Sequence, residues 1–276
     1  MKKYLIPIAV ATVLSALASC TKDDGKKKNS SFKDPEYTEV AKKFTFETSD
    51  KLRTADFTES GYAIVIGSDD VLSKALGSNE KVLISKYTFK DNVYTVADLG
   101  TFSVNGNKVS FNFGTTSGEL TAKVTPGNTA TGDLKKLARA WKVKTTIVSV
   151  SGGTLAKPFG KKYNGCNLDE IVVDAKNYGV KVTNDIKGYN VKNVIFTQAG
   201  TVTFIFADAK PYTGDFNLSN GNFSYSLVTE GNDLINATGK GTAKFVDATC
   251  ELKIDGSFVN GNDNYTTKLE FTLIPE

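Results

Sequence analysis

Side chains that could do chemistry are few in kind in this 276-residue sequence, and histidine is absent. Without histidine, a chain lacks the usual general base at neutral pH, the Ser-His-Asp and Cys-His nucleophile systems, and the commonest zinc ligand. The sequence has no glycine-rich phosphate loop, nucleophile elbow or Cys-x-x-Cys pair. Thirty acidic residues could include a glycosidase pair, but no two are singled out. We therefore expect no enzymatic activity, no cofactor and no metal site.

The remaining reactive groups are three cysteine thiols, at Cys20, Cys166 and Cys250. Cys20 follows an N-terminal segment in which Lys2 and Lys3 precede a mainly apolar run over residues 4–18. A short basic end, an apolar stretch too short to span a membrane comfortably and small residues at its exit predict a secretory signal. Cys20 is then either incidental to an ordinary cleavage site or the point at which a lipid is attached.

The motif Leu17-Ala18-Ser19-Cys20 resembles the lipobox of bacterial lipoproteins, in which the cysteine becomes the lipidated first residue. This resemblance implies that residues 1–19 are a lipoprotein signal peptide and that acyl chains such as palmitate on Cys20 hold the protein in a membrane. Several chains together anchor a protein far more firmly than one chain does. The membrane is therefore an expected partner.

The residues after Cys20 indicate an address. Lys22-Asp23-Asp24 resembles the signal that sends lipoproteins of Bacteroidota to the outer face of the outer membrane. We expect a lipid anchor in the outer membrane with the protein facing the cell exterior; the periplasmic face is the alternative. Residues 20–41 are polar and lysine-rich and predict a flexible tether.

An oxidising envelope bears on the two other thiols. Two leftover cysteines in one secreted domain suggest a disulfide, so we expect a bridge between Cys166 and Cys250. The alternative is that both remain unpaired and buried as small apolar side chains.

Charge argues against a nucleic-acid partner. The 34 basic and 30 acidic residues nearly balance, and arginine occurs only at Arg53 and Arg139. A nucleic-acid-binding protein needs a basic patch, usually with arginines that bind phosphate in a bidentate manner. We expect no nucleic acid as a partner, and a monomer.

Residues 42–124 show the period-two alternation of an all-β domain. Asn105-Gly106 between alternating apolar runs is a strong hairpin signal, and residues 69–76 predict a short helix. A single sheet with one apolar face must pack on something, so we expect a second sheet layer or the next domain to cover it. Residues 125–132 are rich in breakers and predict a linker.

Residues 133–276 form the second predicted domain. A short helical stretch over residues 134–140 precedes a strand that opens on the only tryptophan, with Trp141, Val143 and Ile147 facing one way. This entrance resembles that of lipocalin-like domains, whose pattern is Gly-x-Trp, although Ala138 stands where glycine is expected. Two-domain lipocalin-like lipoproteins are common in Bacteroidota, and the chain resembles them throughout. The resemblance gives Trp141 a structural role, closing one barrel end, with Arg139 near its rim.

About eight antiparallel strands joined by short hairpins follow from Trp141 onward, which suits an all-β, up-and-down barrel. Its interior is either filled by side chains or hollow enough for one small ligand. One short helix after the first strand is predicted from Asn167 as N-cap, Glu170 three residues on and Gly179 at the C-terminal end.

Aromatic residues outside the strands are the candidate ligand contacts. Such rings can stack on a sugar or cover a ligand mouth, although ordinary packing is the alternative reading of each. The candidates in predicted loops or at helix ends are Phe159, Tyr163, Tyr178, Tyr189 and Tyr212.

Three functions remain open from the sequence. The first is a non-enzymatic envelope lipoprotein that binds a small apolar ligand or a glycan, or serves as an accessory to a surface complex. The second is an adhesin or fimbrillin-like assembly protein, since these are also two-domain β lipoproteins. The third is a glycoside-active enzyme, which would need a close carboxylate pair.

Overall fold

The computed structural model describes residues 33–47, 49, 51–68, 72, 82–182, 187–228 and 237–276. The predicted signal peptide, Cys20, most of the predicted tether and most of the predicted helix at residues 69–76 lie outside these residues. In the described part of the chain, no helix is long and apolar enough to cross a membrane.

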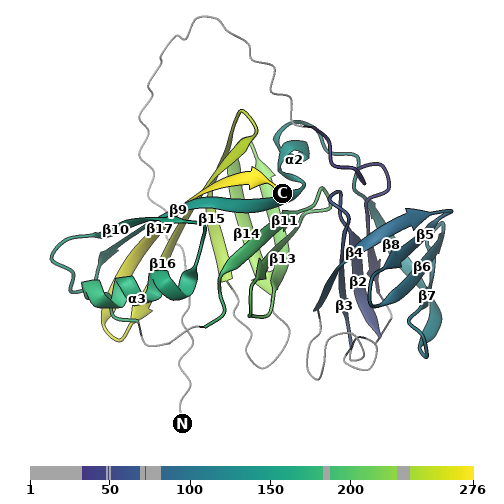
Figure 1. Ribbon diagram of the computed structural model, residues 1–276, viewed down its shortest axis with the longest axis horizontal. Coiled ribbons are helices and arrows are strands. Elements are labelled where there is room, and N and C mark those ends of the chain that lie inside the picture. The colour runs from purple at the N-terminus through teal and green to yellow at the C-terminus, as the bar shows by residue number, and fades with distance from the viewer. Residues whose placement is uncertain are drawn as a thin grey trace, which may run out of the picture.

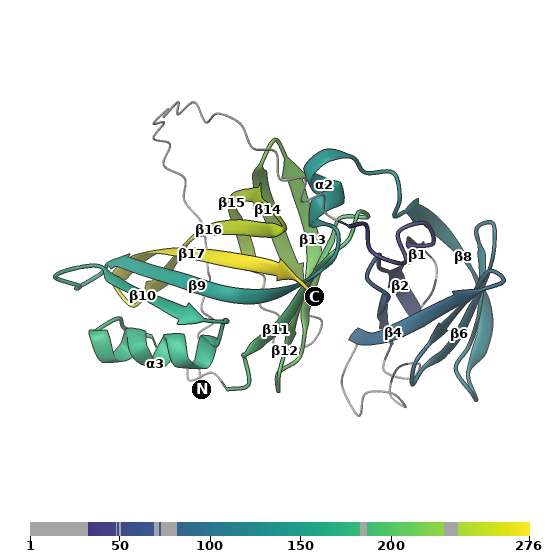
Figure 2. The same cartoon turned by 45° about the horizontal axis from the view of Figure 1, so that its top comes forward.

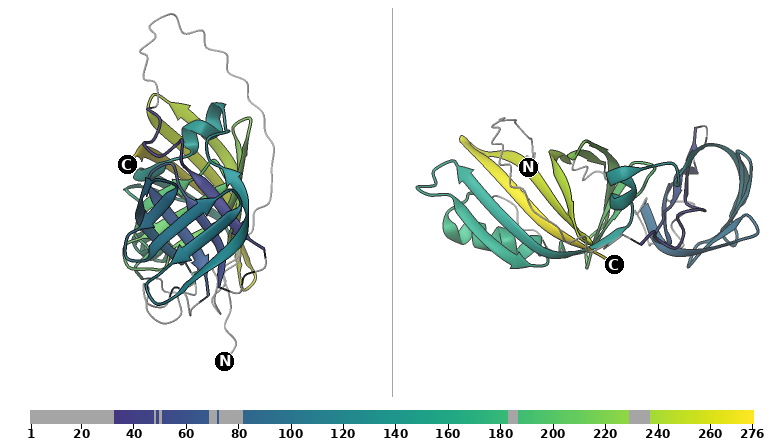
Figure 3. Two further views of the ribbon diagram at one scale, coloured as in Figure 1. Left: turned by 90° about the vertical axis from the view of Figure 1, so that its right-hand side faces the viewer. Right: turned by 90° about the horizontal axis from the view of Figure 1, so that it is seen from above.

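Two antiparallel β-barrels lie side by side and make up the described molecule (Figure 1). Pairing of β1 with β8 closes the first barrel, with Phe44 opposite Val124. Seen from above, this barrel forms a ring (Figure 3). Its strands follow chain order: β1 Lys42–Phe46, β2 Leu52–Phe57, β3 Tyr62–Gly67, β4 Val82–Lys90, β5 Val93–Val96, β6 Gly100–Asn105, β7 Lys108–Asn112 and β8 Ser117–Pro126.

The first sheet buries its apolar face by closing into a barrel. We expected a separate sheet layer or the next domain to cover that face, and the sheet instead curls onto itself. Its interior is filled by aromatic rings, with Phe57 stacked on Tyr94 at 3.9 Å between centroids and edge-on to Phe102 at 5.3 Å. The predicted Asn105-Gly106 hairpin is confirmed between β6 and β7, and Gly106 has the positive φ of 62° that this turn requires.

The second barrel follows α2 (Gly132–Leu137), which sits above the junction of the two barrels (Figures 1 and 2). β9 pairs with β17 and so closes the barrel. This confirms the predicted all-β, up-and-down arrangement. The strands around this barrel are β9 Ala140–Gly152, β11 Val191–Phe196, β12 Thr201–Phe206, β13 Tyr212–Ser219, β14 Asn222–Val228, β15 Ala237–Val246, β16 Thr249–Asn260 and β17 Asp263–Pro275.

An additional strand, β10 (Phe159–Asn164), pairs with β9 alone among the described strands. We predicted a loop in this stretch. Phe159, Lys161 and Tyr163 occupy alternate positions of a strand, but the glycine and the lysines among them mask the apolar alternation. The helix α3 (Leu168–Tyr178) therefore follows the second strand of this domain and not the first, which corrects the prediction. Its ends are as predicted: the Asn167 side chain accepts from the N–H groups of Asp169 and Glu170, and Gly179 closes it at φ 108°.

A β-bulge corrects the predicted facing of β9. Thr145 lies opposite Thr272, whereas Val143 lies opposite Leu273, so one extra residue stands between them on β9. An inserted residue reverses the alternation of all side chains beyond it. Trp141 therefore points into the core, whereas Ile147 is 39% exposed.

The predicted disulfide is not formed. Cys166 and Cys250 are free thiols and both are buried. Cys250 lies within β16, between Phe245 of β15 and Leu273 of β17, whereas Cys166 follows β10. Burial raises the pKa of Cys166 to about 11 and that of Cys250 to about 12, so both remain protonated at neutral pH. The alternative reading, of two small buried side chains, describes these residues.

Candidate functional site: the junction of the two barrels

The junction is formed by the outer faces of strands from both barrels. Ala63 and Val65 of β3 point into the first barrel, so Ile64 between them points outward, yet it is only 1% exposed. Ile195 of β11 likewise alternates with the core residues Val194 and Phe196 and is fully buried. Outward residues of closed barrels are buried only where something covers them. The second barrel meets this face of the first: Asp56, the partner of Ile64 on β2, and Glu59 both contact the turn between β11 and β12.

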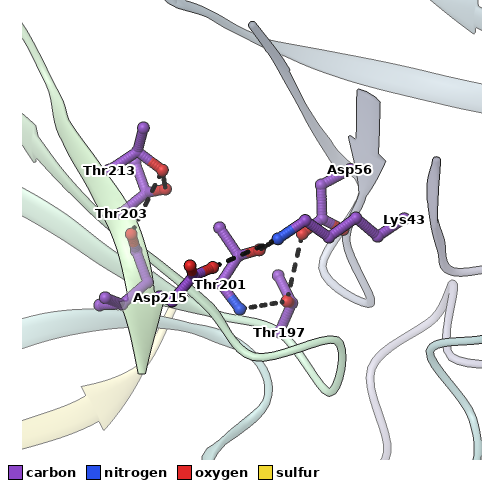
Figure 4. Close-up of polar contacts among 8 residues, drawn as sticks. Lys43, Asp56, Thr197, Thr201, Thr203, Thr213 and Asp215 are labelled. Carbon is purple, nitrogen blue, oxygen red and sulfur yellow. Dashed lines mark hydrogen bonds and ion pairs between the residues drawn. The ribbon is translucent and has the colours of Figure 1, made fainter. Parts of the chain in front are cut away.

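Polar contacts join β1 and β2 to the turn between β11 and β12 (Figure 4). The Lys43 ammonium donates to the Thr201 hydroxyl at 2.9 Å and forms an ion pair with Asp215 at 3.4 Å. The Thr197 hydroxyl donates to the Asp56 carboxylate at 3.3 Å. Thr197 also accepts from the N–H of Thr201, so the turn is fixed from within as it meets the first barrel.

Glu59 makes a further polar contact across the junction. It follows β2 and is 1% exposed. Its Oε1 accepts from the N–H of Gln198 at 2.9 Å, while its Oε2 has no hydrogen-bond partner among the described residues. The Gln198 side chain in turn accepts from the N–H of Ala130 in the linker. One glutamate thus connects the first barrel, the linker and the second barrel.

Burial sets the ionisation of both acids. Desolvation raises the pKa of Glu59 to about 8, against the lowering effect of its backbone hydrogen bonds. Desolvation also raises the pKa of Asp56, and the nearby Lys43 ammonium and the hydroxyls of Thr201 and Thr197 oppose that rise. The carboxyl of Glu59 is therefore mostly protonated at pH 7, which suits a group with no cation beside it.

A second group of contacts lies above the first. The Ser60 hydroxyl accepts from the N–H of Ala140 at 2.8 Å. The Tyr62 hydroxyl contacts both carboxylate oxygens of Glu276 at 2.8 Å, and the Lys86 ammonium lies 3.4 Å from the Tyr62 ring centroid. These contacts join the β2–β3 turn to the beginning of β9, and β3 to the residue after β17.

Residues 33–41, at the end of the predicted tether, lie against the first barrel. The ring centroids of Tyr37 and Tyr87 are 4.9 Å apart, and the backbone N–H of Tyr37 donates to the Glu59 carbonyl. Asp34 forms an ion pair with Lys135 of α2 at 2.7 Å. This segment therefore contacts both barrels.

These elements line a cavity of about 940 Å³ at the junction, which is open to solvent on one side. One wall is the segment of residues 33–37. The others come from Ser60 in the β2–β3 turn, Lys86 of β4, the start of β9, Ala248 in the β15–β16 turn and the end of β17. Its lining carries three cationic and three acidic side chains, together with the Tyr37 ring and the Ser60 hydroxyl: Lys33, Lys86, Arg139, Asp34, Glu36 and Glu276. Mixed charges and hydroxyls suit a polar ligand better than an apolar one.

The structure places Arg139 in this lining and Trp141 beside it. Trp141 is fully buried, and its Nε1 donates to the Leu137 carbonyl at 2.8 Å. The Arg139 guanidinium lies 5.6 Å from the Trp141 ring centroid and donates to the carbonyls of Lys136 and Lys33. Arg139 is 6% exposed, and burial lowers its pKa, which nearby Asp34 partly offsets.

The five aromatic candidates fall into two separate groups, neither of which lines the cavity. Phe159 and Tyr163 are buried under α3, where the Tyr163 hydroxyl donates to Asp174 at 2.9 Å and Phe159 packs against Tyr178 at 5.4 Å.

Tyr189 and Tyr212 form the other group, with Phe206 between them. Their ring centroids are 5.7 Å apart, and each lies 5.1 Å from that of Phe206. We predicted ligand contacts from rings in predicted loops or at helix ends. The ring that lines the cavity is instead that of Tyr37, which belongs to the predicted tether.

Asp56 and Glu59 were also missed. Asp56 stands at an outward position of β2, where an acid ordinarily meets water, and Glu59 stands in the turn after it. Their burial comes from residues about 140 positions away, and the local sequence carries no signal of that contact.

In the described part of the chain, no three His, Cys, Asp or Glu residues gather around a point that could hold an ion. The cavity offers hydrogen bonds, charge and one ring as its means of recognition.

Comparisons with known proteins add little. No family model matches the chain, and no curated protein matches it. Among solved structures, it is similar to a Bacteroides fragilis protein described as a "putative outer membrane protein". The two share 10% identity at a TM-score of 0.23, over 84% of this chain and 94% of that one. A likeness at this TM-score carries no argument about fold or function.

Proposed function

We propose that this chain is a non-enzymatic lipoprotein of the bacterial cell envelope that binds a small polar ligand, such as a glycan, in the cavity between its barrels. The cavity of about 940 Å³ at the junction carries this proposal. Small-molecule sites are concave and combine a few placed polar groups with an aromatic or apolar wall. The junction offers these in Tyr37, Ser60, Lys86 and Arg139.

The barrel interiors support a site at the junction. In the second barrel, Trp141, Phe196 and Phe223 are buried to 2% exposure or less and lie in one contiguous core cluster. The ring of Phe196 lies 5.1 Å from that of Phe216 and 5.8 Å from that of Phe223. Side chains occupy the positions that an apolar ligand would need, so the filled-barrel alternative is the one we adopt.

The exposed edge of β10 argues against strand-addition assembly, the adhesin or fimbrillin-like alternative. β10 pairs with β9 alone among the described strands, but it carries Lys161 and Lys162. Lysines on an edge strand disfavour pairing with another chain. We therefore expect a monomer.

A thermal-shift screen of the purified protein against neutral and acidic oligosaccharides tests the binding proposal. Saturable shifts with one oligosaccharide class are the expected result, because a ligand that binds only the folded state stabilises it. If a correctly folded sample shows no shift with any oligosaccharide, the proposed glycan binding is wrong.

The proposed location, a lipid anchor in the outer membrane facing the cell exterior, is supported by the Leu-Ala-Ser-Cys motif and the Lys-Asp-Asp motif that follows it. We expect Cys20→Ala to abolish metabolic labelling with palmitate, while Cys166→Ala keeps it. Protease treatment of intact cells then separates the two faces of the membrane: we expect digestion of the native protein and protection of an Asp23→Asn/Asp24→Asn variant. Protection of both proteins would place the native chain on the periplasmic face.

A further inference from the structure

Two buried acids lie at the junction and contact the second barrel. Asp56 is 2% exposed and Glu59 is 1% exposed, and both face the turn between β11 and β12. An ionised carboxylate tolerates burial only when cations or several N–H donors surround it. The surroundings of these two acids therefore decide how the junction responds to proton release.

Few groups around Glu59 could stabilise a negative charge. Gln198 offers one N–H to Oε1, the N–H of Glu59 itself also lowers the pKa of the carboxyl, and Oε2 has no partner among the described residues. From β2, Asp56 adds a carboxyl of the same sign, which itself raises the pKa of Glu59. The phenols of Tyr87 on β4 and Tyr37 on the preceding segment face the same space, and a charge on Glu59 disfavours ionisation of Tyr87.

Lys43 is a cation that faces Asp56 at the junction. Lys43 of β1 donates to the Thr201 hydroxyl and forms an ion pair with Asp215 of β13. It acts on Asp56, and the Thr197 hydroxyl donates to the same carboxylate. No ion pair to Glu59 is formed within the described residues, so ionised Glu59 would remain buried near the carboxyl of Asp56.

We infer that Glu59, supported by Asp56, is a proton-controlled clasp that holds the two barrels together when protonated and releases the β11–β12 turn from the first barrel when ionised. Opening hydrates the carboxyl and returns it to the ordinary acidity of a glutamate. The open junction therefore binds fewer protons than the closed one between the two pKa values. Protonation closes the junction and alkaline pH opens it.

The sign and size of the effect follow from proton linkage. The closed-state pKa is about 8, and the open-state pKa is the ordinary value near 4.5. Below the lower value both states are protonated, and pH has no effect. Between the two values each opening releases one proton, so the opening equilibrium constant rises about tenfold per pH unit. Above pH 8 the rise levels off.

Hydrogen exchange of the junction amides in the purified full protein tests the inference. The N–H of Gln198 bonds to Glu59 and that of Ala140 bonds to Ser60, so both report whether the junction is closed. Phe102 of β6, fully buried within the first barrel, serves as the internal reference. We expect protection factors at Gln198 and Ala140 to fall at least tenfold from pH 6 to pH 8, with Phe102 unchanged.

Variants separate the clasp from general effects of pH. Glu59→Gln keeps the shape and the acceptor for Gln198 but cannot ionise, so its junction protection should not change with pH. Asp56→Asn is a second neutral variant and should reduce the pH dependence in part. Glu47→Gln, at an exposed position, should behave like the native protein. Equal pH dependence in Glu59→Gln and the native protein, or an equal fall at Phe102, would overturn the inference.

Discussion

The two buried thiols, Cys166 and Cys250, differ from their predicted state. Cys166 and Cys250 were expected to form a bridge because an envelope protein meets oxidising conditions. Each is instead enclosed in the second barrel's core, where burial holds the thiol in its protonated and unreactive form. The sequence shows how many cysteines the domain has, but it does not show how far apart they lie in the fold.

A thiol assay checks this description. In a Cys20→Ala background, we expect Cys166 and Cys250 to react with a thiol reagent at pH 8 only after denaturation. The reason is that the raised pKa values leave almost no thiolate at that pH and the core excludes the reagent. Addition of a reductant should leave the unfolding temperature unchanged. Two non-reactive sulfurs after denaturation without reductant would show a disulfide and contradict this account.

Asp56 and Glu59 show a different limit at the residue scale. Asp56 lies on the outer face of β2, because Ala55 and Phe57 on either side are core residues. An outward position usually means solvent. Here it means the second barrel, so the pattern gives the direction of the side chain and not the environment that raises its pKa.

At the scale of elements, signals that depend on a few adjacent residues were reliable. Asn167 and Gly179 gave both ends of α3, and Asn105-Gly106 gave the β6–β7 hairpin. Two features needed tertiary pairing and were not predictable: β10, whose lysines face water and a helix, and the bulge in β9 opposite Thr272. The closure of the first sheet into a barrel is of the same kind, because it depends on β1 meeting β8.

Capping of α3 gives one element-scale prediction. Asn167→Ala removes the acceptor for the N–H groups of Asp169 and Glu170 and should cost about 1 kcal/mol of the free energy of unfolding. The matched control is Asn177→Ala in the same helix, at an exposed position without a capping role, which should be neutral or slightly stabilising. Chemical denaturation measures both. An equal effect of the two variants would contradict the assigned N-cap.

The close packing of β15 against β16 gives a second prediction at the scale of elements. A Cβ at Gly241 of β15 would lie 1.7 Å from the Lys253 carbonyl oxygen of β16, so Gly241→Ala must push the two strands apart. We expect a loss of about 3 kcal/mol in the free energy of unfolding. Gly160→Ala in β10 is the control, since a Cβ there meets nothing within 4 Å. Chemical denaturation again measures both, and a tolerated Gly241→Ala would show that the strands are not this close.

At the scale of the whole molecule, the position of one barrel on the other creates the site. Neither barrel alone has the cavity, because its walls come from the segment of residues 33–37, from Ser60 and Lys86 of the first barrel, and from the paired start of β9 and end of β17 in the second. Sequence patterns describe each barrel separately. They placed the candidate rings in the second barrel, whereas the cavity lies where sequence-distant segments meet.

Binding by a matched pair of lysine variants tests the central claim, that the junction cavity is the ligand site. Lys86 lines the cavity and Lys90 does not, although both lie on β4 and alternate to the same face. Calorimetric titration with the oligosaccharide that most raises the unfolding temperature compares Lys86→Met and Lys90→Met with the native protein. We predict at least tenfold weaker binding for Lys86→Met and native affinity for Lys90→Met. Native affinity in both variants would place the site elsewhere and contradict this account.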